Sequence, residues 1–201
     1  MTKREANARG DGDRLREQLV AAASELLLAP QPLAAPSLRA VARACSVSPA
    51  AVYLHFASQQ DLIRAVVAAQ LDALRADLPR LEDPALPLRE RLEEYAVRYA
   101  QWGVAHPGAY QLIFESADRL GLDDHDDRPG WDMIDAVAAA LGGDPEAGGV
   151  TAIQATRLWV ALHGLTSLRI HKPGSIWTTA LDEDARAIVA LHLAAMGVER
   201  P

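Results

Sequence analysis

The sequence has one cysteine, no long apolar run and no hydrophobic leader at its start. A single thiol, Cys45, excludes a disulfide within the chain, and we expect it to be a small buried side chain. No apolar run approaches the length that crosses a membrane, which excludes a helical membrane protein. The first residues, MTKREANARGDGDR, contain no signal core, so we expect a cytoplasmic protein with no membrane partner.

Motifs of the common enzyme classes are also missing. The glycine pairs at 142–143 and 148–149 lack the lysine of a phosphate-binding loop, and we interpret them as breaks between helices. No nucleophile elbow and no pair of carboxylates at catalytic spacing occurs. Segment 123–127, DDHDD, has metal-binding residue types without calcium-loop spacing, which indicates a solvated acidic loop. We therefore predict no catalytic residue, no metal site and no cofactor.

Basic residues are scarce as well, and their distribution is uneven. The chain carries 20 Lys and Arg against 27 Asp and Glu, a net charge of −7. Residues 1–64 nevertheless hold eight basic and six acidic residues, a balance of +2, which leaves −9 for the remainder. Positive potential is thus confined to the N-terminal third, where it favours contact with nucleic acid, while an acidic body repels it.

Apolar residues, by contrast, are abundant, and they recur at helical spacing. They make up 50% of the 201 residues, and no segment alternates convincingly between apolar and polar as a half-buried strand would. The pattern therefore predicts an all-α protein. The expected helices cover residues 13–27, 37–45, 48–56, 58–78, 88–103, 110–114, 131–141, 149–170 and 181–196.

Two of these helices are joined by a very short turn, within the run SLRAVARACSVSPAAVYLHFASQQDLI at 37–63. Ser37 can cap a helix whose apolar residues recur at i, i+3, i+4 and i+7, and that helix stops at 45–47. The next helix begins at once, with Ser48 as its cap and Pro49 in the first position, where a missing N–H costs nothing. Helices joined so tightly must cross steeply, which is typical of a helix-turn-helix.

The second helix of this pair exposes small residues. With Val52 and Phe56 turned to the core, its outward face has no long charged side chain. Such a face fits the major groove of DNA, about 12 Å wide, where small side chains can meet base edges while Tyr53 and His55 reach phosphates. An ordinary helical hairpin with a small packing face is the alternative interpretation.

The run 38–62 also resembles the DNA-binding domain of the tetracycline-repressor family of bacterial transcription regulators. The specific part is YLHF at 53–56 followed by SQQDL at 58–62. The family usually carries a lysine, which contacts a phosphate, where this chain has Gln59. The predicted DNA-binding residues are Ser37, Arg39, Ser48, Pro49, Ala50, Ala51, Tyr53, His55 and Gln59.

The chain divides into two domains after a polar arm. We expect a disordered arm at 1–12, a helix-turn-helix domain at 13–64 and a helical ligand-binding and dimerisation domain at 65–201. The helix 58–78 begins in the first domain and ends in the second. A shift of the second domain can therefore be transmitted along this helix to the first.

The last two helices, 149–170 and 181–196, are apolar over a broad face. They carry more apolar surface than one small body covers, which a second copy of the chain would bury. A two-fold dimer would place two DNA-reading helices about one DNA turn apart, roughly 34–36 Å or a multiple of it. The alternative is that the final helix only covers the core of one chain. The predicted interface residues are Ile153, Leu158, Leu162, Leu165, Ile188, Leu191, His192 and Ala195.

Aromatic and histidine residues gather in the second domain, where they can line an apolar cavity or simply fill a core. This half resembles a subgroup of the family's ligand-binding domains that is named for a Trp-x-x-x-His-Gly signature, here Trp159, His163 and Gly164. That resemblance implies a pocket for a small molecule. The predicted ligand-binding residues are Tyr99, Trp102, His106, Tyr110, Phe114, Trp131, Trp159 and His163.

Together these patterns predict a ligand-responsive transcription regulator, most simply a repressor. It would bind a palindromic operator in double-stranded DNA as a homodimer and be released by a small, largely apolar effector. The expected fold is all-α, with a three-helix helix-turn-helix domain, a C-terminal helical domain and about nine helices. Two alternatives stand beside it: a helical small-molecule-binding protein or enzyme whose helix-turn-helix is only structural, and a regulator controlled by a protein partner.

Overall fold

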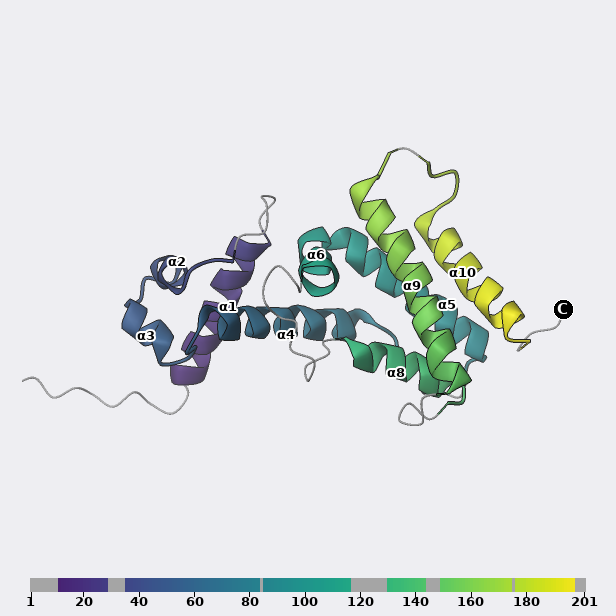
Figure 1. Ribbon diagram of the computed structural model, residues 1–201, viewed down its shortest axis with the longest axis horizontal. Helices are drawn as coiled ribbons and strands as arrows, with labels where there is room; N and C mark the ends of the chain where they lie inside the picture. The colour runs from purple at the N-terminus through teal and green to yellow at the C-terminus, as the bar shows by residue number, and fades with distance from the viewer. Residues whose placement is uncertain are drawn as a thin grey trace, which may run out of the picture. The chain divides into compact units, whose positions relative to one another are not determined.

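A computed structural model describes residues 11–28, 35–83, 85–116, 130–143, 149–174 and 176–197. Within these ranges the chain forms nine α-helices and no strand (Figure 1). They are α1 (Asp11–Leu27), α2 (Leu38–Ala44), α3 (Pro49–Tyr53), α4 (Gln59–Asp77), α5 (Leu88–Ala105), α6 (Pro107–Glu115), α8 (Trp131–Ala140), α9 (Val150–His171) and α10 (Leu181–Ala195).

The all-helical prediction is therefore confirmed for the described residues, and most predicted helix ends agree with the structure to within two residues. The largest differences occur where α3 stops at Tyr53, before the predicted end at 56, and where α6 begins three residues earlier than predicted. Of the predicted arm at 1–12, residues 1–10 lie outside the described residues, whereas Asp11 and Gly12 belong to α1, so the arm was predicted two residues too long. The acidic loop with segment 123–127 also lies outside the described residues.

The chain folds into two compact units. The first consists of Met1–Gln70 and Gln111–His125, and the second consists of Leu71–Tyr110 and Asp126–Pro201. Both α4 and α6 are shared, because the boundaries fall inside these two helices. The first unit is called the reading unit below, and the second is called the body.

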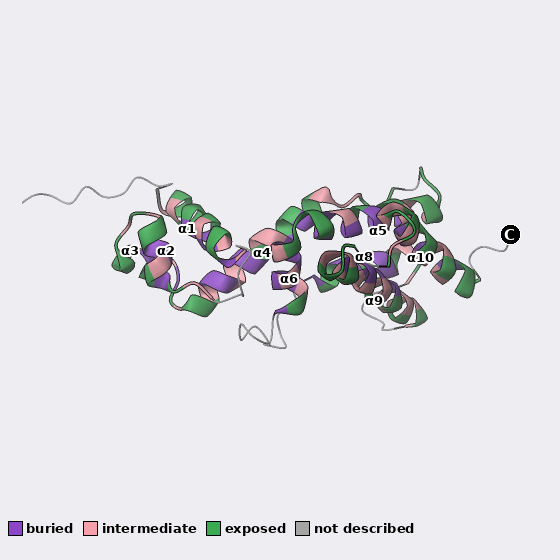
Figure 2. Cartoon of the chain, turned by 90° about the horizontal axis from the view of Figure 1, so that it is seen from above, coloured by how far each residue is buried: buried purple, intermediate pink, exposed green. Residues whose placement is uncertain are grey.

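Short-range hydrogen bonds set the helix starts in the reading unit. The hydroxyl of Ser37 accepts from the amide of Ala40 at 3.2 Å, and that of Ser48 accepts from the amide of Ala51 at 3.2 Å. At the start of α4, Ser58 and Asp61 cap each other reciprocally. The core between these helices is apolar and buried (Figure 2), and includes Leu19, Val41, Val52, Phe56 and Leu62.

Packing between distant segments builds the body. Helix α5 packs against both α9 and α10, which lie side by side, and α8 packs against α9 (Figure 1). One close approach between distant segments occurs at Gly103 of α5. A side-chain carbon there would lie 2.7 Å from Cδ2 of Tyr110 and closer still to Cγ2 of Thr166, and both of these residues are fully buried. Only glycine fits this crossing.

None of the helices that the structure describes combines the length and the apolar character needed to cross a lipid bilayer. Over the same ranges, no group of three or more His, Cys, Asp or Glu side chains is placed to hold a metal ion.

Candidate functional site

The turn between α2 and α3 is held by backbone hydrogen bonds. The amide of Val47 donates to the carbonyl of Ala42 at 2.9 Å, and the amide of Ser46 donates to that of Arg43 at 3.1 Å. Ser46 adopts a φ of 56°, a left-handed conformation that costs a non-glycine residue energy. The four residues between α2 and α3, 45–48, thus form a tight turn, and the helix-turn-helix is present.

Helix α3 and the residue after it present one outward face. Pro49 and Ala50 are exposed, Tyr53 is 57% exposed and Leu54 is 84% exposed, whereas Val52 is fully buried. Helix α3 spans only Pro49–Tyr53 and contains no charged residue. The side chains of this face are small at Pro49 and Ala50 and large at Tyr53 and Leu54. The four residues Pro49, Ala50, Tyr53 and Leu54 are called the reading face below.

Leu54 is the member of the reading face that the sequence analysis missed. The predicted DNA-binding residues include its neighbours Tyr53 and His55 but not Leu54. Its position was readable, since Leu54 follows Ala50 by four residues and so shares its side of the helix. His55 is only half-buried, and Ala51 is also partly covered.

The serines predicted to meet DNA have a structural task as well. Ser37 and Ser48 are exposed, and both hydroxyls cap the helices that follow them. Each capping hydroxyl satisfies one of the first amides of its helix, so it is already engaged within the chain. The two serines therefore place α2 and α3 rather than project as free groups.

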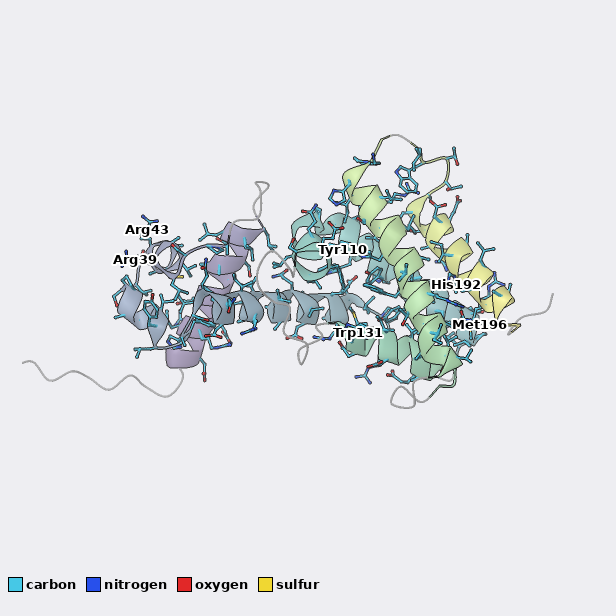
Figure 3. All side chains as sticks on the ribbon, in the orientation of Figure 1. Arg39, Arg43, Tyr110, Trp131, His192 and Met196 are labelled. Carbon is cyan, nitrogen blue, oxygen red and sulfur yellow. The ribbon has the colours of Figure 1, made fainter. Side chains whose placement is uncertain are left out.

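Two arginines lie on the exposed side of α2. Arg39 and Arg43 are both exposed (Figure 3), and they point away from the packed interior of the reading unit. Only Arg39 was predicted to contact DNA. Arg43, one turn further along the same helix, adds a second positive charge to the same surface of α2.

Gln59 is engaged with the backbone. Its side-chain nitrogen donates to the carbonyls of Ala35 at 2.9 Å and Pro36 at 3.1 Å. The side chain at the position where the family usually has a lysine thus ties the start of α4 to the segment that leads into α2. We expect it to orient that segment instead of binding a phosphate.

The body contains an apolar cavity between α5, α8 and α9. The space in which the centre of a water-sized molecule fits is about 20 Å³, which is enough for roughly one water. None of the described residues that line it is charged, and among them two tyrosines and a tryptophan carry a polar side-chain group. The lining residues are Leu92, Tyr95, Tyr99, Met133, Ile134, Val137, Ala155, Leu158, Trp159 and Leu162.

Of the eight predicted ligand-binding residues, Tyr99 and Trp159 line this cavity. His106 is exposed and stacks on Trp102 with ring centres 4.9 Å apart. Trp131 is 44% exposed at the start of α8 (Figure 3), and Phe114 belongs to the reading unit. The predicted aromatic and histidine residues therefore do not all line the cavity. Apolar residues on the helices supply most of the lining, and their spacing in the sequence looks the same in a cavity and in a filled core.

Two further predicted residues, Tyr110 and His163, do not line the cavity but contact residues that do. The hydroxyl of Tyr110 lies 2.6 Å from Nδ1 of His163 and 3.1 Å from the hydroxyl of Tyr99. The His163 ring stacks between Tyr110, at 5.4 Å, and Trp159, at 5.3 Å. Trp159 and Tyr99 in the cavity wall are therefore connected through the stacked rings of His163 and Tyr110 and through the contact between the hydroxyls of Tyr110 and Tyr99.

An ion pair fixes the start of α8 near the cavity. Arg75 of α4 donates from Nε and Nη2 to the two carboxylate oxygens of Asp132, both at 2.8 Å. This hydrogen bonding lowers the pKa of Asp132 and raises that of Arg75. Burial, and next the charge of Asp132, raise the pKa of the Tyr95 phenol, which remains neutral at physiological pH.

The residues predicted to meet a second copy fall into two groups. Ile153 is 53% and Leu191 is 70% exposed, Ala195 is exposed, and Ile188 and His192 are partly covered. Figure 3 shows His192 on α10, where its Nδ1 lies 2.9 Å from the carbonyl of Ile188. The predicted leucines Leu158, Leu162 and Leu165 are instead buried in the body of the same chain. They turn inward because α9 packs on α5 and α8, so the exposed side of α9 carries Val160 and Leu168 in their place.

Comparison with sequence families gives two matches. Residues 19–66 match the family described as "Bacterial regulatory proteins, tetR family", and residues 92–196 match the one described as "Tetracyclin repressor-like, C-terminal domain". No curated protein sequence matches the chain significantly.

Solved structures with a similar fold include three regulators. A putative TetR-family transcriptional regulator from Mesorhizobium loti is 20% identical, with 92% of this chain and 98% of that chain covered and a TM-score of 0.67. The flavonoid-responsive regulator FrrA is 22% identical, with 91% and 97% covered and a TM-score of 0.69.

The third structure is NalD of Pseudomonas aeruginosa, described as the secondary repressor of the MexAB-OprM multidrug efflux pump. It is 18% identical, with 92% and 97% covered and a TM-score of 0.62. At these identities the structures show a shared fold. The family matches cover the helix-turn-helix and more than half of the whole chain, and on that basis the protein belongs to the tetracycline-repressor family of bacterial regulatory proteins.

Proposed function

We propose that this protein is a transcriptional repressor that binds a palindromic operator as a homodimer and releases it when a small, uncharged, largely apolar effector binds the body. The observation that carries the proposal is the reading face, where small and apolar side chains are exposed on a helix whose neighbours Val52 and Phe56 are buried. Folding alone gives no reason to expose such a face. Insertion into a major groove of DNA explains why these side chains are exposed.

The surroundings of the reading face support DNA as its partner. Arg39 and Arg43 supply exposed positive charge on α2, and the first turns of α2 and α3 begin at exposed serine caps. In this arrangement the arginines hold phosphates, which positions the protein without reading sequence. Tyr53 at the edge of the face adds a hydroxyl within reach of a phosphate.

The exposed apolar residues on α9 and α10 support a dimer. Val150 at 72%, Ile153 at 53%, Val160 at 56% and Leu191 at 70% exposure carry apolar area that a soluble monomer would leave in water. Gly164 lies on the same helix, and a side chain there would meet nothing within 4 Å in its own chain. A second copy packed against these helices would bury this surface and use the space at Gly164.

The cavity supports an uncharged aromatic effector. Its described lining is apolar apart from Tyr95, Tyr99 and the indole of Trp159, so a charged ligand would be buried without a partner. FrrA responds to flavonoids, and NalD represses a multidrug efflux pump, according to their descriptions. We extend that ligand class, planar and mostly apolar, to this chain. The stacked Trp159 and His163 beside Gly164 also support membership of the Trp-His-Gly subgroup.

The DNA-binding proposal is tested with Tyr53→Ala. We expect at least a tenfold loss of affinity, about 1.4 kcal/mol or more, for DNA upstream of the protein's own coding sequence, measured by fluorescence anisotropy. Leu26→Ala is the matched control, because Leu26 is 44% exposed in the same unit but lies on α1. Full affinity of the Tyr53 variant, or equal affinity for unrelated DNA, would contradict the proposal.

The dimer is tested separately by sedimentation. Leu191→Asp places a charge on the exposed side of α10 and should convert the dimer to a monomer, whereas Val104→Asp, at a 40% exposed position of α5, should leave it intact. A monomeric wild type would refute the proposed dimer.

For the effector, a neutral flavone should raise the unfolding temperature and release DNA, and its carboxylated analogue should do neither. Tighter binding of the carboxylated analogue would refute the proposed uncharged effector.

A further inference from the structure

Leu54 is the most exposed large apolar side chain in the part of the chain that the structure describes, at 84%. Burial of a leucine side chain stabilises a fold, so the exposure of Leu54 forgoes stability that most leucines contribute. A single exposed leucine needs no explanation by itself. This one lies in the reading face, two residues from Val52 and two from Phe56, which are buried.

The backbone around Leu54 fixes its direction. The amides of His55 and Phe56 both donate to the carbonyl of Val52, at 2.9 Å and 3.0 Å, which closes the end of α3 tightly. With Val52 and Phe56 anchored in the core on either side, Leu54 has no inward route. It therefore projects on the same side as Ala50 and Tyr53, at the i, i+3 and i+4 positions of one helix face.

The chemistry of this position selects its partner on DNA. Phosphates and the polar base edges would gain nothing from an isobutyl group. The apolar group that the major groove displays is the 5-methyl of thymine. It is present in A·T and T·A base pairs and absent from G·C and C·G pairs. Two other members of this face, Pro49 and Ala50, are small enough to let α3 approach the base edges.

We propose that Leu54 reads the 5-methyl group of a thymine in each half-site of the operator, and so determines sequence specificity. This inference rests on the proposed DNA-binding function and names one residue and one base group for it. Leu54 carries no charge, so its contribution is independent of salt. Arg39 and Arg43, in contrast, act on the phosphates and make binding salt-dependent.

The test begins with in vitro selection of the operator from random DNA by the full-length protein. Each thymine of the selected site is then replaced in turn by deoxyuridine, which removes only the methyl group. At one position per half-site we expect about a fourfold loss of affinity for the wild type, from the transfer energy of one methyl group. Leu54→Ala should lose affinity for the thymine site and be insensitive to deoxyuridine at that position.

Two controls separate this role from others. Leu26→Ala should remain as sensitive to deoxyuridine as the wild type. The slope of log affinity against log salt should be unchanged in Leu54→Ala, and it should fall by about 0.9 in Arg39→Ala if that arginine neutralises one phosphate. A changed sedimentation coefficient of Leu54→Ala would mean that a second copy covers the leucine, and would overturn the proposal.

The two possible failures are distinguishable. Selection that enriches no sequence, together with full affinity of Tyr53→Ala, refutes DNA reading as a whole and this proposal with it. Enrichment of an operator in which no thymine methyl matters, or in which Leu54→Ala shows the same deoxyuridine loss as the wild type, refutes only the role of Leu54.

Discussion

The reading unit and the body are stabilised in different ways. In the reading unit, the caps made by Ser37, Ser48 and Ser58 join residues three apart, and the side chain of Gln59 adds a longer-range link to the backbone before α2. In the body, hydrogen bonds join residues far apart in the chain, such as Tyr110 and His163, which are 53 positions from each other. Geometry in the first is set locally, and geometry in the second is set by packing.

This difference separates the tasks of the two units. Hydrogen bonds between residues near in sequence hold α3 and its exposed residues in place, so the reading face can be altered without unfolding the unit. The body depends on close contact between α5 and α9, so a change at that crossing affects the cavity and the stability together. Four substitutions test this contrast, and they follow in order of expected effect.

Gly103→Ala should destabilise the body most. The new side chain would overlap Tyr110 and Thr166, both fully buried, and overpacking of this kind costs about 3 kcal/mol. Thermal unfolding of the purified protein measures the loss. Gly174→Ala, where nothing lies within 4 Å of the new carbon, serves as the control. A Gly103→Ala protein as stable as the wild type would show that the crossing is looser than described.

Tyr110→Phe removes the buried hydroxyl that lies 2.6 Å from His163 and 3.1 Å from the hydroxyl of Tyr99. The expected loss is about 2 kcal/mol, because buried partners keep their desolvation cost after the hydroxyl is gone. Chemical denaturation measures it. Tyr53→Phe removes an exposed hydroxyl and should change stability little. Equal effects of the two variants would remove the distinction between packed body and exposed reading face.

Ser58→Ala deletes one half of the reciprocal cap at the start of α4, where the hydroxyl accepts from the amide of Asp61 at 3.1 Å. We expect a loss of about 1 kcal/mol. Hydrogen exchange should become faster for the first amides of α4 and stay unchanged in α9. Ser58→Asp keeps an acceptor and should restore protection. Faster exchange throughout the body would argue against locally determined geometry in the reading unit.

The ion pair between Arg75 and Asp132 should give the smallest effect, because both side chains are more than one third exposed. Hydrogen bonding by Arg75 lowers the pKa of Asp132, so the pair stabilises the fold above the unfolded pKa of about 3.9 and loses this contribution as pH falls through the lowered value. Unfolding temperatures of wild type and Asp132→Asn should therefore differ slightly at pH 6 and converge near pH 2. A constant difference would mean that the charge of Asp132 is irrelevant.

The same contrast explains what the sequence could predict. Serine caps, Pro49 at a helix start and the apolar periodicity predicted the helices and the turn, because these signals act within a few residues. The inward direction of Leu158, Leu162 and Leu165 could not be predicted, since apolar spacing does not say which neighbour a helix will meet. Those three leucines belong to the same apolar α9 as Val160, which is exposed.

The candidate site divides in the same way. Tyr53, Ala50 and Arg39 were predicted to be outward and are exposed, and Leu54 was missed although its helical position indicated it. In the body, aromatic residues were grouped by type. The structure separates them, because Tyr99 and Trp159 line the cavity, whereas His106 and Trp131 are exposed. Residue type alone cannot report which side of a helix faces a cavity.

The small size of the cavity has a kinetic consequence. A space of about 20 Å³ admits roughly one water, so an effector of the proposed class can enter only while α8 and α5 are parted. Its measured affinity is then its intrinsic affinity multiplied by the fraction of molecules that are open. At high effector concentration the rate of association should level off at the rate of opening, and shortening Met133 in the cavity wall should raise that ceiling.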